Sequence, residues 1–97
     1  MNNFGLSDEV VADIKNAVSK YPCIEQIKIF GSRAKGNFKR YSDIDLAIFG
    51  AFDADVLIGF KDCLEELDVI YRFDVVHYEM LQKGAMREHI DRVGIAL

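Results

Sequence analysis

The segment Ile29–Phe49 reads IFGSRAKGNFKRYSDIDLAIF, and it decides how this chain is expected to fold. An apolar strand stops at Gly31 and Ser32, and a second apolar strand begins after a polar loop. Alternate residues of a strand point to the same face of a sheet, so Asp43 and Asp45 are predicted to share a face. The segment therefore predicts a sheet that carries two carboxylates beside a glycine–serine turn.

Apolar spacing in the rest of the chain predicts helices that alternate with strands. Strands interleaved with helices favour an α+β domain with a small mixed sheet and its helices packed on one face. Gly94 is expected to end the last helix, and Ile95–Leu97 either adds a short edge strand or stays loose. The expected helices are 7–21, 53–67 and 79–93, the last broken near Gly84, with a helical turn over 31–36, and the expected strands are 24–30, 44–49 and 69–77.

The bulk composition is that of an ordinary globular domain. The chain has 97 residues, enough for one domain over 1–97 and not for two. No apolar run approaches the roughly 20 residues that a membrane span needs, and the N-terminus lacks the pattern of a secretory signal. Cys23 and Cys63 form no disulfide framework, which predicts a reducing, cytoplasmic location. A net charge of −4 argues against general binding of nucleic acid.

A local concentration of positive charge lies between the glycine turn and the aspartates. Arg33, Lys35, Lys39 and Arg40 supply 4 of the 12 basic residues. Such a patch on an acidic protein fits a small polyanion better than a long nucleic acid. We predict Arg33 and Lys35 as accessory phosphate contacts, against the alternative that they are merely solvated.

The turn and the paired aspartates each have a plain and a functional interpretation. Gly31 and Ser32 at a strand-to-helix turn permit close approach of a phosphate, although such a pair is often a bare turn. Two carboxylates about 4 Å apart repel by roughly 4 kcal/mol at an effective dielectric of 20, and a magnesium ion relieves that repulsion. The alternative is that Asp43 and Asp45 cap the turn into the strand.

Asp74 is the only acid in the apolar run 69–76. Charged residues are rarely buried unless paired, so the plain interpretation is a salt bridge with Arg72. The functional interpretation places Asp74 beside Asp43 and Asp45. Three carboxylates can hold two metal ions that clamp the attacking and leaving oxygens of a displacement, and the third can act as a general base.

These residues resemble the DNA polymerase β-like nucleotidyltransferase superfamily. The match is a glycine–serine pair, ten intervening residues, an Asp-x-Asp pair and a later aspartate in a strand. The short chain looks like the minimal nucleotidyltransferases that are often paired with a helical HEPN-domain protein in prokaryotic toxin–antitoxin systems. The resemblance implies that Gly31 and Ser32 bind nucleotide phosphate, that Asp43 and Asp45 ligate two Mg²⁺ ions, and that Asp74 completes the site.

The implied reaction moves a nucleoside monophosphate, AMP for an ATP substrate, from a nucleoside triphosphate to an acceptor hydroxyl and releases pyrophosphate. In such systems the acceptor is often the toxin, so the chain is expected to act as an antitoxin. Because no second helical domain follows Leu97, we expect a partner chain or a second copy in a homo-oligomer to complete the site.

Two other functions remain open on the sequence alone. The first is a binding module in which catalysis is vestigial and the partner is neutralised by contact. The second is a phosphatase-type Asp-x-Asp enzyme, which is disfavoured because its first aspartate usually follows a strand, whereas Asp43 precedes one.

Overall fold

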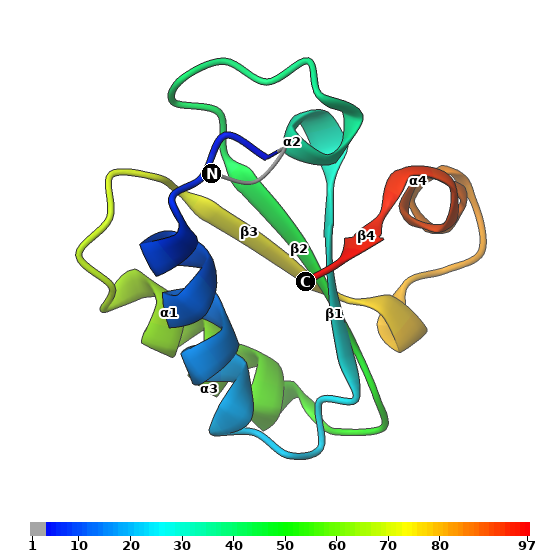
Figure 1. Cartoon of the computed structure of the whole chain (residues 1–97). Coiled ribbons are helices and arrows are strands. Elements are labelled where there is room, and N and C mark those ends of the chain that lie inside the picture. Colours follow the sequence, from blue (N-terminus) through cyan, green and yellow to red (C-terminus); the bar gives the residue numbers. More distant parts are fainter. Residues whose placement is uncertain (1–3) are drawn as a thin grey trace.

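The computed structural model describes residues 4–97, and it shows a small mixed sheet with helices on its faces (Figure 1). The first expected helix begins after Ser7, whose side chain caps it by accepting a hydrogen bond from the Val10 N–H at 3.2 Å. Asp53 caps the helix that follows the second strand in the same way. The elements are α1 (Asp8–Ser19), β1 (Gln26–Phe30), α2 (Gly31–Lys35), β2 (Ile44–Phe49), α3 (Ala54–Glu65), β3 (Phe73–His77), the 3₁₀ turn η1 (Tyr78–Met80), α4 (Ala85–Val93) and β4 (Ile95–Ala96).

The four strands lie in the order β3-β2-β1-β4. β1 is antiparallel to both of its neighbours, and β2 is parallel to β3. The final residues therefore do form an edge strand, with Ile95 opposite Ile29. The parallel register places Asp45 opposite Asp74, and this pairing positions the site described below.

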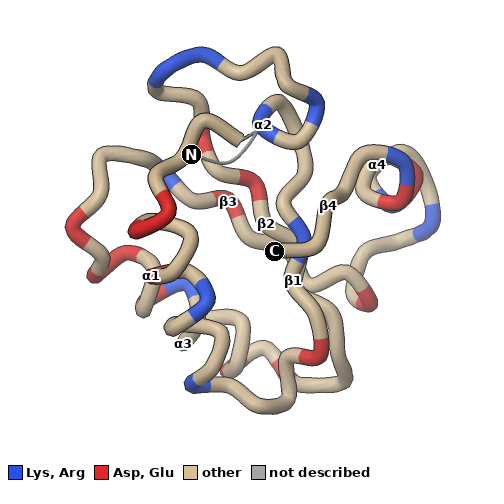
Figure 2. Tube along the Cα trace, in the orientation of Figure 1, with Lys and Arg blue, Asp and Glu red and all other residues tan. Residues whose placement is uncertain are grey.

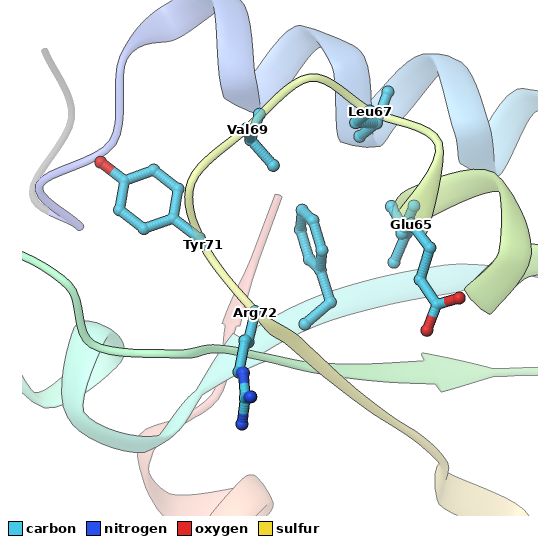
Figure 3. Close-up of a pocket in the computed structure, with 7 residues that line it drawn as sticks. Glu65, Leu67, Val69, Tyr71 and Arg72 are labelled. Atoms are coloured by element: carbon cyan, nitrogen blue, oxygen red, sulfur yellow. The ribbon is translucent and has the colours of Figure 1, made fainter.

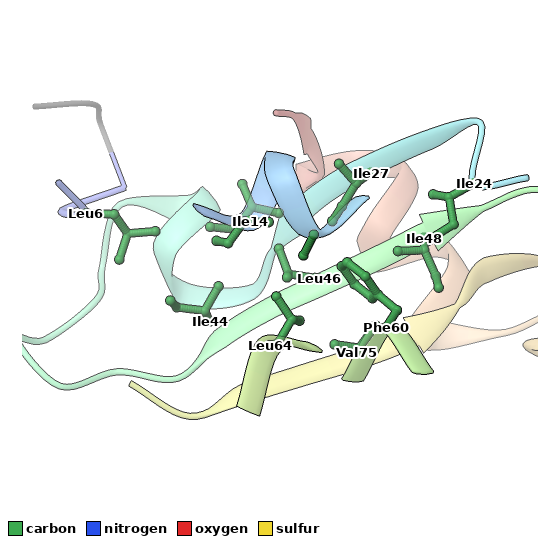
Figure 4. Packing of buried hydrophobic residues seen from close by; sticks show 12 residues of the cluster. Leu6, Ile14, Ile24, Ile27, Ile44, Leu46, Ile48, Phe60, Leu64 and Val75 are labelled. Atoms are coloured by element: carbon green, nitrogen blue, oxygen red, sulfur yellow. The ribbon is translucent and has the colours of Figure 1, made fainter. Parts of the chain in front are cut away.

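The main core lies between the sheet and the two long helices, α1 and α3. The residues of β2 that face the helices, Ile44, Leu46 and Ile48, are fully buried in it (Figure 4). Apolar burial on this face contributes the larger share of the hydrophobic stabilisation. The other buried members are Leu6, Ile14, Ala17, Ile24, Ile27, Ile29, Phe60, Leu64 and Val75.

The fourth helix lies on the opposite face of the sheet. Its Ile90 packs with Phe30 and Ala47 in a second, smaller cluster, and Ala47 is fully buried there. The expectation that helices cover one face thus holds for α1 and α3, while α4 covers part of the other. The reason is that the outward positions of β1 and β2 include apolar residues that need cover at one end of that face.

Two strands are shorter than predicted. β1 begins at Gln26 rather than residue 24, and β3 begins at Phe73 rather than residue 69. β3 starts where its partner starts, because Phe73 lies opposite Ile44, the first residue of β2. Within residues 4–97, no helix is both long enough and apolar enough to cross a bilayer.

Candidate active site

Three aspartates gather at one end of the β2–β3 pair. Asp45 lies inside β2 and pairs in register with Asp74 of β3, while Asp43 directly precedes β2. Side chains alternate along a strand, so Asp43 and Asp45 lie on the face opposite Ile44 and Leu46. Asp43 and Asp74 are exposed and Asp45 is half-buried. The structure therefore brings the three predicted carboxylates to one open surface.

Within residues 4–97, no cationic side chain forms an ion pair with this acidic cluster. The pKa of Asp45 is raised from 3.8 to about 6, first by burial and then by the charges of Asp74 and Asp43. Among residues 4–97 the one ion pair joins His77 to Glu79, so Arg72 does not neutralise Asp74 in this part of the chain. A partly buried carboxylate without a cationic partner, such as Asp45, is typical of a site that receives a cation.

Gly31 is the residue of the turn that lies against Asp45. It begins α2 directly after Phe30, which is opposite Asp45 in the antiparallel register. Its φ is +71°, a left-handed conformation that favours glycine, and a Cβ at this position would overlap Asp45 Oδ2. The glycine is thus required both by its backbone conformation and by the close approach of the carboxylate.

Ser32 follows Gly31 in the same turn and is half-buried. Its neighbour Gly31 lies against Asp45. The Ser32 carbonyl oxygen accepts hydrogen bonds from the N–H groups of Gly36 and Asn37 at 2.9 and 3.2 Å, which close the short helix α2. Gly36 ends the helix with a φ of 87°. The glycine–serine turn is therefore a closed local structure at the edge of the acidic surface.

The two basic residues predicted to bind phosphate lie in different environments. Lys35 is exposed at the end of α2, and the exposed Lys39 and Arg40 extend the basic segment along the next loop, above the acidic starts of β2 and β3 (Figure 2). Arg33 is only 1% exposed, and its guanidinium donates to backbone carbonyls. Lys35 is therefore available to a polyanion. Arg33 is buried, so it is neither an exposed phosphate contact nor a solvated side chain.

The donor set fits magnesium held jointly with a substrate. Magnesium takes oxygen ligands and is usually bound through one or two carboxylates together with substrate phosphates. In residues 4–97, no three His, Cys, Asp or Glu side chains converge closely enough to enclose a metal ion by themselves. The paired aspartates therefore fit an open, shared site and not a closed structural centre.

A cavity beside the start of β3 is separate from the acidic surface. It has a volume of about 340 Å³ and lies under the loop between α3 and β3 (Figure 3). Phe73 lines it from the helix-covered face, the face opposite Asp74. The acidic surface is therefore open and lies outside this cavity.

One pair of rings next to the acidic strand positions was not indicated by the sequence. Phe30 is the cross-strand neighbour of Asp45, and its ring meets the ring of His89 of α4 edge-on, with centroids 5.9 Å apart. No local signal in the sequence links a histidine in the last helix to the aspartates. Only the packing of α4 on this face brings the His89 ring against Phe30.

Comparison with known proteins agrees with this geometry. Residues 12–97 match the family model described as "Polymerase beta, Nucleotidyltransferase". The chain is 30% identical over 94 residues to a Haemophilus influenzae protein named "Probable protein adenylyltransferase MntA", a match that covers 95% of this chain and 82% of that one. The chain therefore belongs to the polymerase β nucleotidyltransferase family.

A solved structure supports the fold alone. A crystal structure from Sulfolobus solfataricus, provisionally described as a nucleotidyltransferase, superimposes with a TM-score of 0.56 at 20% sequence identity. The alignment covers 91% of this chain and 76% of that one. The predicted nucleotidyltransferase fold is confirmed.

Proposed function

We propose that this protein is a magnesium-dependent nucleotidyltransferase that moves AMP from ATP to a hydroxyl group of a partner protein. The observation that carries the proposal is the cluster of Asp43, Asp45 and Asp74, which lack a cationic partner within the described chain and lie beside the Gly31 turn. Membership of the family supports nucleotidyl transfer, and the name of the Haemophilus influenzae relative supports a protein acceptor.

Each residue has a role that follows from its position. The Gly31–Ser32 turn binds the phosphates of the nucleotide, and Lys35 adds a positive charge at the rim. Asp43 and Asp45 would hold the Mg²⁺ ions. When bound, magnesium neutralises the charge that develops on the phosphate oxygens. The half-burial of Asp45 strengthens its attraction to a cation, because fewer water molecules compete for the carboxylate.

Asp74 acts on the acceptor. Its carboxylate is exposed beside Asp45, where an incoming hydroxyl can reach it. The acceptor oxygen forms a bond to the α-phosphorus, and the bond from that phosphorus to the bridging oxygen breaks. The hydroxyl proton passes to Asp74, and pyrophosphate leaves. AMP thus becomes linked to the acceptor with no net change in oxidation state.

We further propose that the acceptor is a HEPN-domain toxin and that this chain is its cytoplasmic antitoxin. The open acidic surface supports a second chain, or a second copy in a homo-oligomer, as part of the complete site. Catalysis and simple contact are distinguishable, because contact alone does not need the carboxylates.

The test supplies each α-labelled nucleoside triphosphate with magnesium to the purified chain and a lysate of the source cell. We expect label from ATP on a protein, loss of label with EDTA, and a loss on the order of 100-fold with Asp43→Asn. The matched control is Asp68→Asn, a change at an exposed aspartate in the loop after α3. Full protection of cells by Asp43→Asn would favour the contact-only module, and absence of label with the wild type would refute the transferase.

A further inference from the structure

Arg33 is the most extensively bonded side chain of the described residues, and the transfer mechanism above does not use it. Nε and Nη2 both donate to the Ser42 carbonyl, at 3.1 and 2.9 Å. Nη1 donates to the Phe4 carbonyl at 2.8 Å, and Nη2 also approaches the Arg40 carbonyl at 3.4 Å. All of its nitrogen atoms therefore face backbone oxygen.

Two aromatic rings enclose the same guanidinium. Its central carbon lies 5.1 Å from the centroid of Phe38 and 4.7 Å from that of Tyr71. The Phe38 ring also lies directly against Gly5, where an added Cβ would overlap it. The planar cation thus lies between the loop after α2 and the segment that leads into β3.

The segments that meet at Arg33 are those that carry the acidic surface. Arg33 is in α2, two residues after Gly31. The Ser42 carbonyl belongs to the peptide unit that joins Ser42 to Asp43. Tyr71 lies three residues before Asp74, and the adjacent Arg72 carbonyl accepts a hydrogen bond from the Ile44 N–H at 2.8 Å. The Arg33 side chain therefore links the Gly31–Ser32 turn to the segments that lead into both carboxylate-bearing strands.

The charge of Arg33 is unusual for a purely structural group. It is 1% exposed and forms no ion pair with an acid in residues 4–97. Burial of an unpaired charge costs free energy unless hydrogen bonds compensate it. A lysine offers one compact ammonium group, whereas the flat fork of an arginine can serve two separate carbonyls and stack between two rings.

We propose that Arg33 is a positioning residue: its guanidinium holds the Ser42 carbonyl and the Tyr71 ring, and thereby keeps Asp43 and Asp74 in place relative to the Gly31–Ser32 turn. The proposal rests on the proposed transferase function for its effect on rate, but not for its effect on the local structure. It replaces the sequence-based interpretation of Arg33 as a phosphate contact.

The test compares Arg33→Lys with Arg92→Lys, the same change at an exposed position of α4. Amide hydrogen exchange is measured along the metal-free chain, together with kcat and KM for the nucleotide. In Arg33→Lys we expect exchange in residues 37–45 to be about tenfold faster or more, with β1 and α1 unchanged. We expect kcat to fall roughly 10- to 100-fold while KM changes little, because misplaced groups slow the chemical step.

A second variant keeps the test informative if Arg33→Lys does not fold. Tyr71→Leu keeps apolar bulk at a half-buried position and removes the ring, so it should speed exchange at residues 72–74 and lower kcat. A raised KM with unchanged kcat would overturn the proposal in favour of a phosphate contact. Wild-type exchange in both variants would also overturn it. If the wild type transfers no nucleotide, the proposed function fails while the exchange data still decide the positioning role.

Discussion

The two ends of the β2–β3 pair differ in whether their polar side chains have partners within the described chain. At the far end, the buried His77 donates from Nε2 to the Gly50 carbonyl at 2.7 Å and stacks on Phe52, with ring centroids 3.8 Å apart. Glu79 accepts from the Gly50 N–H at 3.0 Å and lies 3.6 Å from His77. Those groups satisfy one another within the chain.

At the near end, the register of the same two strands places Asp45 opposite Asp74, so that two like charges face each other. The raised pKa of Asp45 is the consequence of its burial and of that repulsion. The same two strands can thus carry a self-sufficient polar network and, three residues away, an unsatisfied one. The contrast supports the proposal that the near end binds a ligand, whereas the polar groups of the far end stabilise the fold.

Asp74→Asn removes one of the paired carboxylates at the near end of the strands. If the near end is catalytic, nucleotide transfer should fall on the order of 100-fold or more, because the acceptor loses its base. The folded chain should be at least as stable as the wild type, because a source of repulsion is removed. Single-turnover kinetics and urea unfolding measure the two effects. A variant that loses stability but keeps its rate would assign Asp74 to the scaffold.

Gly31→Ala should have the next largest effect, with Gly36→Ala as its matched control. Both glycines have positive φ, so each alanine should cost about 1–2 kcal/mol of stability. Only the Cβ at Gly31 meets Asp45, whereas a Cβ at Gly36 meets nothing within 4 Å. Transfer should therefore fall roughly 10- to 100-fold in Gly31→Ala alone. Equal transfer rates in the two variants would show that the Gly31 turn does not contribute to the active site.

His77→Leu probes the far end. It leaves the Gly50 carbonyl without its donor and should lower the free energy of unfolding by about 2 kcal/mol. Once the protein is folded, the transfer rate should match that of the wild type, because the acidic surface lies at the other end of the strands. Chemical denaturation and steady-state kinetics give both numbers. A large loss of transfer rate in the fully folded His77→Leu variant would show that the two ends are coupled.

The smallest effect is a pH dependence of stability. The pKa of Asp45 is about 6 in the folded chain, above its ordinary 3.8, so between these values the folded state binds more protons. The free energy of unfolding therefore falls as the pH rises through this window, by about 1–2 kcal/mol after allowance for solvent screening.

Urea unfolding of metal-free wild type and Asp45→Asn from pH 4 to pH 7 isolates this contribution, because all other groups titrate in both chains. The variant should gain stability over the wild type as the pH rises. A constant difference would mean that the Asp45 carboxylate is not strained by its neighbours.

Local patterns were sufficient for much of the fold. The strand 44–49 has the predicted bounds, Ser7 and Asp53 cap their helices, and the inward residues of β2 are those that alternation indicates. Helix caps and alternating faces depend on neighbours within a few residues, so the sequence contains that information directly. The presence of the three aspartates and of the glycine turn was also visible in the sequence.

Long-range packing decided what these residues do to one another. The sequence alone predicts Arg33 as a phosphate contact because it directly follows Gly31 and Ser32, whereas the fold turns its side chain inward to the carbonyls of Phe4 and Ser42. Likewise, α4 lies on the second face because Phe30 and Ala47 need cover there. The sequence determined the chemistry of the residues and their local conformation. Only the tertiary structure decided the register that sets Asp45 against Asp74, because that pairing joins segments separated by a helix and two loops.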